Sequence, residues 1–311
     1  MKNFLNISDT SIQDLTGILE QAKMMKNARI GLPKGACDEG QPLSQHIVAL
    51  VFEKPSTRTR TSFDVGVRQL GGQPMLLSGT EMQLGQGETI SDTARVLSRY
   101  VDLIMLRTFE SQTLYEMAKH STVPVINGLT DYNHPCQIMC DIFTIFENKK
   151  HLDNLKIVYV GDGNNIVNSW LVMASILPMH FVCVCPSGYE PDNELMDKVQ
   201  SSNISTFELS HNPSESVIGA DIIYTDVWAS MGQKNESKSR EKIFLEYQVN
   251  SAMMSKTNKN TLLMHCLPAE RGRETTDNVM ESKNSIVFQQ AENRMHIQNA
   301  IMLKLFDKGS L

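Results

Sequence analysis

Apolar runs of strand length alternate with stretches of helical periodicity along most of the chain. The runs predict strands at residues 46–52, 75–77, 101–106, 123–126, 155–160, 181–185, 204–208, 221–225 and 261–264. The periodic stretches predict helices at 8–25, 57–70, 91–100, 135–147, 166–177 and 193–200, after Pro213, and from Glu292 onward. Strands that alternate with helices in this way are typical of parallel sheets with helical crossovers, so the pattern predicts an α/β fold.

Two of these helices have apolar faces that can be assigned residue by residue. Ser8 is expected to cap the first helix, and the apolar face of that helix is expected to hold Ile12, Leu15, Ile18, Leu19, Ala22 and Met25. In the helix at 91–100, the inward positions are expected to be Ala94, Val96, Leu97 and Tyr100. The first helix is interpreted as a packing element without a role in binding.

The length of 311 residues allows two domains of ordinary size, each with its own core. A polar segment, Asn148–His151, separates two series of βα units. We therefore predict one domain over residues 1–147 and a second over 148–289, with the C-terminal helix at 290–311 packing back on the first. Ligands of open parallel sheets bind at the carboxyl ends of the strands, so the active site is expected in the cleft between the two βαβ domains.

The turn after the first strand, Glu53–Thr61, is the most informative stretch of the sequence. Ser56 is a good N-cap for the next helix, whose first-turn amides would point N–H groups at a ligand. Lys54, Arg58 and Arg60 crowd this helix N-terminus, where each cation is disfavoured by a few tenths to about 1 kcal/mol. Amides, hydroxyls and a guanidinium that converge on one point favour a bound phosphate. The Gly-Lys-Ser/Thr ending of an ATP-type phosphate loop is absent from the sequence.

Other reactive side chains follow the ends of predicted strands. The first half of the chain contributes Arg107 and His134 beside the anion-binding turn, which suits a phosphorylated substrate. The second half contributes amide, carboxylate, hydroxyl and thiol groups that suit a zwitterionic amine. These groups belong to Asn165, Asp226, Ser230 and Cys266. The division predicts a transferase that acts on two substrates at the interface between the domains.

Two other functions remain open at this point. The turn Gly161–Asn165 connects a strand to a helix, as in dinucleotide-binding proteins. However, Ile166 occupies the third glycine position and no acidic residue closes the next strand, which argues against a nicotinamide-dependent dehydrogenase. A non-catalytic protein that binds an anion would keep the phosphate turn but show no turnover.

Composition and charge narrow the class of partner. Hydrophobic residues make up 41% of the chain and charged residues 21%, as in globular proteins, and the net charge of -6 argues against nucleic acid as the main partner. The N-terminal segment becomes polar too soon for a secretory signal, and no stretch approaches the roughly 20 apolar residues of a membrane span. We therefore expect a cytoplasmic protein. The six cysteines include no metal-type CxxC pair, and only Cys266 is set apart for a chemical role.

Five motifs resemble those of the aspartate/ornithine carbamoyltransferase family. They are Ser56–Arg60, Arg107–Thr108, His134–Gln137, Asp226–Gly232 and His265–Pro268. The motifs occur in the family's order, from roughly the first helix to the last. The resemblance implies carbamoyl phosphate in the first domain, L-ornithine in the second, and L-citrulline and phosphate as products, with no cofactor or metal. It also implies a homotrimer that shares its sites between neighbouring subunits.

The resemblance also assigns site residues by position. Carbamoyl phosphate would be bound by Ser56, Thr57, Arg58, Thr59, Arg107, His134 and Gln137, with Gln83 contributed by the neighbouring subunit. L-Ornithine would be held by Asn165, Asp226, Ser230 and Met231. The positions that line the junction of the two substrates, and would also contact carbamoyl phosphate, match Cys266, Leu267 and Arg294.

The ornithine branch of the family is favoured by two features. The aspartate branch carries a lysine in the loop that here spans Gln83–Glu88, and it lacks the pair of motifs Ser230–Gly232 and His265–Pro268. Glu270 departs from the histidine that is common at this position of the family, without an assigned effect. The compact length favours a role in arginine biosynthesis.

The expected reaction gives each catalytic candidate a task. Attack by the ornithine amine on the carbamoyl carbon places negative charge on the carbonyl oxygen, to which Thr59, Arg107 and His134 are the expected donors. The amine must first lose a proton, because an alkyl ammonium group titrates near 10.4. Asp226 and Cys266 are expected to position the amine and assist that loss. A thiolate nucleophile at Cys266 that forms a carbamoyl-enzyme is the alternative.

Overall fold

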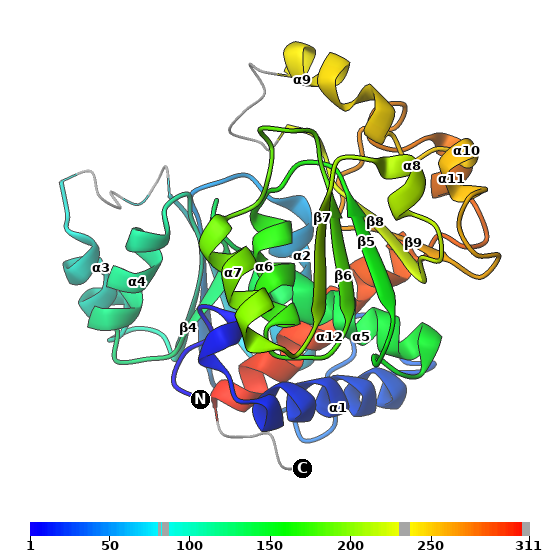
Figure 1. The fold of residues 1–311 in the computed structure, drawn as a ribbon. Coiled ribbons are helices and arrows are strands. Elements are labelled where there is room, and N and C mark those ends of the chain that lie inside the picture. The colour runs from blue at the N-terminus through cyan, green and yellow to red at the C-terminus, as the bar shows by residue number, and fades with distance from the viewer. Residues whose placement is uncertain (80–81, 83–86, 230–236, 307–311) are drawn as a thin grey trace. The chain divides into compact units, whose positions relative to one another are not determined.

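The computed structural model describes residues 1–79, 82, 87–229 and 237–306 of the chain. The chain folds into two compact units, Met1–Phe143 with Glu292–Leu311, and Thr144–Ala291 (Figure 1). It passes from one unit to the other within helix α5 (Pro135–Lys149) and again within helix α12 (Val287–Leu305). Each unit is built on its own parallel sheet, which confirms the predicted class of two parallel-sheet α/β domains. The placement of the active site in a cleft between them stays a prediction.

The first unit contains a four-stranded parallel sheet in the order β2-β1-β3-β4. The strands are β1 (Ile47–Phe52), β2 (Gln73–Ser78), β3 (Leu103–Arg107) and β4 (Val125–Leu129). Strands β1 and β3 lie at the centre, and their apolar residues are fully buried except for Ile47 and Phe52 at the two ends of β1, which are half-buried. The register pairs Phe52 with Arg107, so the turn after β1 and the arginine that ends β3 are neighbours at the carboxyl edge of this sheet.

The helices of the first unit are α1 (Ile12–Ala28), α2 (Thr57–Gln69), α3 (Ile90–Leu97) and α4 (Ser111–His120), with parts of α5 and α12 and the 3-10 turn η1 (Ile7–Asp9). Three of these helices, α1 to α3, begin at side-chain caps, whereas α4 begins without one. Ser11, Ser56 and Thr89 each accept a hydrogen bond from the backbone amide three residues later. This N-cap bond satisfies one of the amides that an isolated helix start leaves without a partner.

The second unit contains a five-stranded parallel sheet in the order β7-β6-β5-β8-β9. Its strands are β5 (Lys156–Val160), β6 (His180–Val184), β7 (Thr206–Ser210), β8 (Ile222–Thr225) and β9 (Leu262–His265). Its helices are α6 (Asn165–Ala174), α7 (Asn193–Ser202), α8 (Pro213–Ser216), α9 (Ser237–Phe244), α10 (Ser251–Met254) and α11 (Asp277–Met280), with the 3-10 turn η3 (Leu245–Tyr247). Thr225 pairs with both Val160 and His265, so the segments after β5, β8 and β9 are neighbours at the carboxyl edge.

Several local predictions about the helices of the first unit are wrong. Ser8 lies in the 3-10 turn η1, and Ser11 caps α1 instead. Ile12 is 55% exposed because it occupies the first position of α1, before the helix reaches the core. Val96 and Tyr100 are 46% and 66% exposed. Helix α3 ends at Leu97, so the helical periodicity that placed Tyr100 inward no longer applies there.

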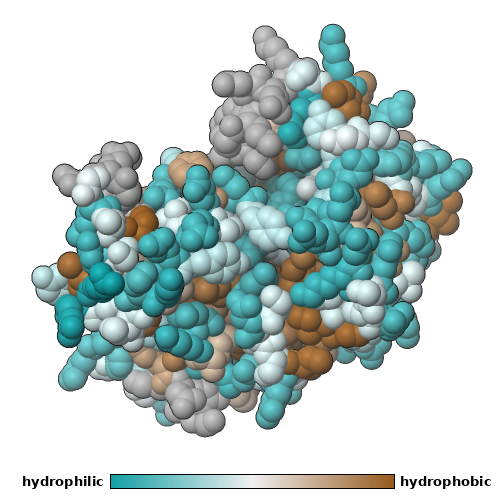
Figure 2. All heavy atoms as spheres, turned by 60° about the vertical axis from the view of Figure 1, so that its left-hand side comes forward, coloured by the Kyte–Doolittle hydropathy of each residue, from teal (hydrophilic) through white to brown (hydrophobic). Residues whose placement is uncertain are grey.

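Polar side chains dominate one face of the molecule (Figure 2). On the face drawn in Figure 2, hydrophilic residues cover most of the molecule and hydrophobic residues form smaller groups between them. None of the helices in the described ranges combines the length and the apolar character that crossing a membrane requires.

Candidate active site

Thr59 is the centre of the turn Glu53–Thr61, the predicted anion site of the first unit. It lies in the first turn of α2 on the same buried face as Phe63 and Val67, so a hydroxyl occupies a position where the helix otherwise places apolar side chains. Its Oγ1 accepts hydrogen bonds from Arg107 Nη1 at 3.1 Å and from Arg294 Nη2 at 2.7 Å. The structure thus brings together three of the predicted carbamoyl phosphate ligands.

The two arginines reach Thr59 from distant parts of the chain. Arg107 ends strand β3, next to the turn after β1, and only 5% of it is exposed. Arg294 was expected near the start of the last helix, but α12 begins at Val287, so Arg294 lies within the helix and is 4% exposed. A guanidinium is not deprotonated in proteins, so two buried positive charges meet at this hydroxyl.

The predicted N-cap at the start of α2 is confirmed by the structure. Ser56 Oγ accepts from the backbone amide of Thr59 at 3.3 Å, which makes Ser56 the N-cap of α2. Thr57 is exposed, whereas Ser56 and Arg58 are half-buried. Their hydroxyl and guanidinium groups therefore remain reachable from solvent, beside the buried Thr59.

His134 lies directly before α5 and belongs to the same charged environment. Burial holds the pKa of its imidazole well below the usual value of 6.5, and nearby positive charges lower that pKa further. Those charges belong to Arg294, Arg107 and Lys54. His134 is therefore unprotonated near neutral pH, and the excess of positive charge around it favours a bound anion.

Gln137 and Cys136 occupy the first turn of α5 and are buried. Gln137 Nε2 donates to Asp141 Oδ1 at 2.8 Å, and its Oε1 has no hydrogen-bond partner among the described residues. A ligand donor would satisfy that oxygen, which is compatible with the predicted role of Gln137. Burial raises the pKa of the Cys136 thiol to about 12, so Cys136 is a packed thiol rather than a nucleophile.

Lys54 is a residue of this site that the motif comparison did not assign. It forms an ion pair with Asp131, and its Nζ lies 4.4 Å from the centroid of the Phe109 ring. Lys54 thereby connects the turn after β1 to the segments that follow β3 and β4. Desolvation lowers the pKa of Lys54, and Asp131 opposes that shift. The sequence indicated a role for Lys54 only through its position inside the Glu53–Thr61 turn.

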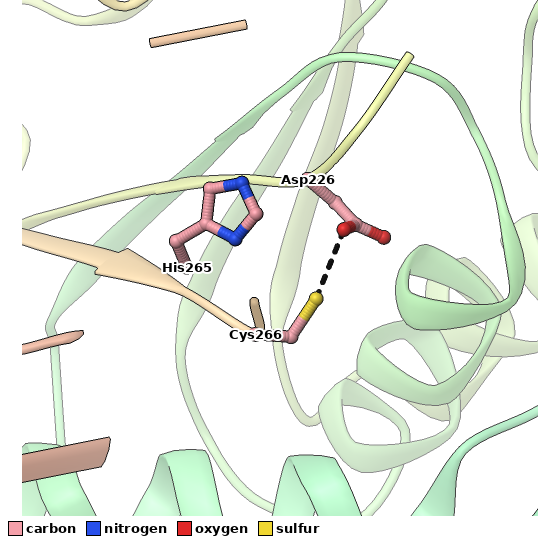
Figure 3. A group of neighbouring side chains, drawn as sticks. All are labelled: Asp226, His265 and Cys266. Atoms are coloured by element: carbon pink, nitrogen blue, oxygen red, sulfur yellow. Dashed lines mark hydrogen bonds between the residues drawn. The ribbon is translucent and has the colours of Figure 1, made fainter. Parts of the chain in front are cut away.

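Asp226 is the centre of the candidate site in the second unit. It follows strand β8 directly and is 6% exposed. Its Oδ1 accepts from Cys266 Sγ at 3.0 Å and from the backbone amide of Val227 at 2.9 Å, while its Oδ2 accepts from Asn164 Nδ2 at 2.8 Å. Figure 3 shows the carboxylate and the thiol facing each other from the ends of neighbouring strands. The two residues that were expected to position the amine and take up its proton are thus in contact.

Asn164 was missed by the sequence comparison, which assigned the next residue, Asn165. Asn164 Oδ1 accepts from the amides of Ile166 and Val167 and caps α6, while its amide group holds Asp226. Asn165 is the first residue of α6 and is half-buried. The sequence offered one indication of this role. Asparagine is preferred at N-cap positions, so Asn164 could be expected to cap α6 with its side-chain amide beside the site.

Asp226, His265 and Cys266 each offer one ligand atom, and these atoms lie within 4.8 Å of one another (Figure 3). However, His265 Nε2 is 3.1 Å from Glu274 Oε1, and His265 Nδ1 accepts from the backbone amide of Leu267 at 2.8 Å. Both ring nitrogens are therefore engaged, and a metal ion would have to displace one of two buried hydrogen bonds. The cluster does not fit a resident metal, and no metal chemistry is derived from it.

The glycine-rich turn after β5 has a packing explanation. A Cβ on Gly163 would lie 2.4 Å from Pro191 N, so only glycine fits against that backbone. Asp162 in the same turn forms a 2.7 Å ion pair with Arg240, which also donates to Trp228 O at 2.8 Å. Residues of the Gly161–Asn165 turn thus contact other segments of this chain. This explains the glycine without a bound dinucleotide and weakens the dinucleotide interpretation.

Three predicted site residues cannot be placed. Gln83, Ser230 and Met231 lie outside the described residues. Leu267, in contrast, is half-buried directly after Cys266, with φ of 59°.

Comparison with known proteins identifies the family. Residues 2–147 match the carbamoyl-P binding domain of aspartate/ornithine carbamoyltransferases, and residues 153–305 match their Asp/Orn binding domain. This chain belongs to the aspartate/ornithine carbamoyltransferase family. It is therefore an enzyme of the carbamoyltransferase class.

Individual carbamoyltransferases are similar over nearly the whole chain. An ornithine carbamoyltransferase of Cereibacter sphaeroides is 51% identical over 303 residues, which cover 97% of this chain and 98% of that protein. The structure of ornithine carbamoyltransferase from Pyrococcus furiosus has a TM-score of 0.90 at 45% identity and covers 97% of this chain and 96% of its own. The anabolic ornithine carbamoyltransferase of Campylobacter jejuni has a TM-score of 0.91 at 34% identity, with coverage of 99% and 100%.

Proposed function

We propose that this carbamoyltransferase transfers the carbamoyl group of carbamoyl phosphate to the side-chain amine of L-ornithine, giving L-citrulline and phosphate. The observation that carries the first half of the proposal is the buried hydroxyl of Thr59 between Arg107 and Arg294. The similarity of the whole chain to proteins named ornithine carbamoyltransferase supports the second substrate.

Carbamoyl phosphate binds, in this proposal, to the first domain over residues 1–147 and to the helix that follows 290. The phosphate takes the amides and hydroxyls at the start of α2 together with Arg58, because helix N-termini and guanidinium groups are natural partners of phosphate oxygens. The carbamoyl oxygen takes donors from Thr59, Arg107 and His134. The proposed ligand set is Ser56, Thr57, Arg58, Thr59, Arg107, His134, Gln137 and Arg294, with Gln83, Cys266 and Leu267.

L-Ornithine binds, in this proposal, to the second domain over residues 148–289. The carboxylate of Asp226 is buried, hydrogen-bonded on both oxygens and adjacent to Cys266, which suits a substrate amine better than an anionic group. The proposed ligand set is Asn165, Asp226, Ser230 and Met231. Asn164 supports this set by holding Asp226.

The reaction is a displacement at the carbamoyl carbon. The lone pair of the ornithine amine forms the new C–N bond, the C–O bond to phosphate breaks, and the phosphate leaves with the bonding electron pair. The proton of the amine passes to the departing phosphate or to Asp226, either directly or through Cys266, whose thiol gives its own proton to the Asp226 carboxylate as it takes up the proton of the amine. Each donor to the carbonyl oxygen strengthens its hydrogen bond as that oxygen gains charge, which is worth roughly 3 to 4 kcal/mol for a single donor in comparable sites.

The assembly, location and direction of the reaction are proposed on other grounds. We propose a homotrimer, as the family resemblance implies. We also propose a location in the cytoplasm, because all six cysteines are free thiols, as is usual in a reducing compartment. The biosynthetic direction in arginine metabolism is supported by the anabolic description of the Campylobacter jejuni relative.

The deciding experiment measures citrulline and phosphate formation from carbamoyl phosphate with four acceptors. L-Ornithine should support turnover at a kcat/KM at least about 100-fold above that for putrescine, N-acetyl-L-ornithine and L-aspartate, because a site built for specific polar groups rejects substrates that lack them. Asp226→Asn should lose this turnover. A chain that releases phosphate only with another acceptor, or with none, would refute the proposal.

A further inference from the structure

Strand β9 delivers Cys266 and Leu267 through a short segment that is held on both sides. Before the thiol, the backbone amide of His265 donates to Gln290 Oε1 at 2.9 Å, and Gln290 Nε2 lies 3.2 Å from the Tyr224 hydroxyl. After the thiol, the amide of Leu267 donates to His265 Nδ1 at 2.8 Å. The side chain of His265 therefore fixes the backbone on the far side of Cys266.

The hydrogen-bond pattern determines which nitrogen of His265 carries the proton. A backbone amide can only donate, so Nδ1 must be the acceptor and the ring proton sits on Nε2. From there it is donated to Glu274 Oε1 at 3.1 Å. The tautomer matters because it leaves Nδ1 free to accept from the amide of Leu267. Leu267 has φ of 59°, a left-handed conformation that is unfavourable for a leucine unless such a hydrogen bond stabilises it.

Glu274 is the residue that favours the proton on Nε2 of His265. Its side chain, like that of His265, is fully buried. Its Oε1 accepts from His265 Nε2 and from the amide of Glu270 at 2.6 Å, and its Oε2 has no hydrogen-bond partner among the described residues. A carboxylate that is buried in this way is costly for stability, so its presence here calls for a function.

We propose that Glu274 is a positioning residue for the proposed carbamoyl transfer. Acting through the Nε2–H tautomer of His265, it holds the backbone of Leu267, and thereby sets the direction in which Cys266 points toward Asp226. Glu274 itself touches neither the thiol nor the carboxylate of Asp226. This inference rests on the proposed function for its kinetic consequence, but its geometric consequence can be measured without turnover.

The test compares Glu274→Leu, which removes both acceptor oxygens, with Glu274→Gln, which keeps one of them. The matched control is Glu270→Gln, because Glu270 lies in the same segment and pairs with Arg273 instead, at 2.8 Å. Glu274→Leu should lower kcat about 10- to 100-fold, as misplacement by about 1 Å can do. Its KM for carbamoyl phosphate should change less than threefold, and the other two variants should stay within about threefold of the parent in kcat.

The second readout is the alkylation rate of Cys266 by iodoacetamide, followed by mass spectrometry of its peptide. Cys37 is exposed in the other unit and serves as an internal reference in the same sample. Glu274→Leu should change the ratio of the two rates at least about fivefold, while Glu274→Gln and Glu270→Gln should leave it near the parent value. A merely structural role would lower the melting temperature but leave this ratio and the kcat of the folded enzyme unchanged.

His265→Asn and His265→Leu keep the proposal testable if Glu274→Leu fails to fold. An asparagine oxygen can accept from the amide two residues later, so His265→Asn can retain the bond to Leu267, whereas His265→Leu cannot. The alkylation ratio should therefore be closer to the parent in His265→Asn. The proposal would be overturned if His265→Asn and His265→Leu both kept the alkylation ratio of the parent. It would also be overturned by a folded Glu274→Leu protein with the kcat and the alkylation ratio of the parent. If the parent enzyme forms no citrulline, the proposed function fails, but the alkylation ratio still decides the positioning role.

Discussion

Arg294 Nη2 lies 2.7 Å from Thr59 Oγ1, although 235 residues separate the two along the chain. Arg107 donates to the same oxygen at 3.1 Å. A hydroxyl has two lone pairs and one proton, so the two arginines occupy both acceptor positions and leave the Thr59 proton to be donated. Thr59 is therefore prepared as a hydrogen-bond donor to an oxygen of a ligand.

Replacement of Thr59 by valine keeps the shape of the side chain and removes that donor. We expect kcat/KM for carbamoyl phosphate to fall roughly 100- to 1000-fold, the cost of one donor to a developing oxyanion. Steady-state citrulline formation measures the effect. Thr59→Ser should retain most of the activity, and Thr61→Val, at an exposed position of the same helix, should retain nearly all of it. Parental kinetics in Thr59→Val would show that the hydroxyl has no part in the reaction.

The low pKa of His134 predicts a pH dependence of stability. Burial and neighbouring positive charges keep the folded-state pKa well below 6.5, so as pH falls below about 6.5 the unfolded chain takes up a proton that the folded chain refuses. The neutral His134 therefore costs no unfolding free energy above pH 6.5. Below that pH the unfolding free energy decreases, with a slope of at most about 1.4 kcal/mol per pH unit. His134→Gln should flatten the decline in unfolding free energy between pH 7 and 5, measured by urea denaturation. Parallel curves for the two proteins would contradict the prediction.

Asn164 performs two tasks that substitution can separate. Asn164→Ser keeps a capping oxygen for α6 but loses the donor to the buried Asp226 carboxylate, so unfolding free energy should fall by about 1.5–3 kcal/mol from the lost hydrogen bond alone. Its kcat/KM for L-ornithine should fall roughly 10- to 100-fold, since hydrogen bonds to charged groups are worth about 1.5–3 kcal/mol. Asn164→Ala should lose the same activity and, in addition, about 1 kcal/mol of stability. If Asn164→Ser retained full ornithine kinetics, the bond to Asp226 would have no role in substrate use.

The ion pair of Arg240 and Asp162 predicts a large effect on stability. Both side chains are nearly buried, with 8% and 12% exposure. Arg240→Met therefore removes the ion-pair partner of the nearly buried Asp162 carboxylate. We expect a loss of about 3–5 kcal/mol in unfolding free energy. Asp162→Asn combined with Arg240→Met should recover part of that loss, because the buried charge is then gone. Equal stability of the single and double variants would mean that the pair does not carry the effect.

Although it did not predict helices α4 and α9 to α11, the sequence by itself determined the order of the strands, the class of the fold and the N-cap of α2. These features depend on local periodicity and on motifs of a few residues, such as the Ser56 cap, which the structure reproduces. Local patterns were weaker where two neighbouring residues can play the same part. Ser8 and Ser11 can both cap a helix, but Ser8 lies within the 3-10 turn η1, and Ser11 caps α1.

Only the tertiary structure decided which polar groups meet. Asn164 holds Asp226, because strands β5 and β8 are neighbours in the sheet and their ends lie side by side. The contact of Arg294 with Thr59, and that of Glu274 with His265, likewise join segments whose separation no periodicity encodes. Periodicity specifies the face of an element on which a side chain lies, whereas sheet order and packing between elements specify its partner. The physical reason is that a hydrogen bond depends on distances of a few tenths of an ångström, which are set only when the core has closed around both partners.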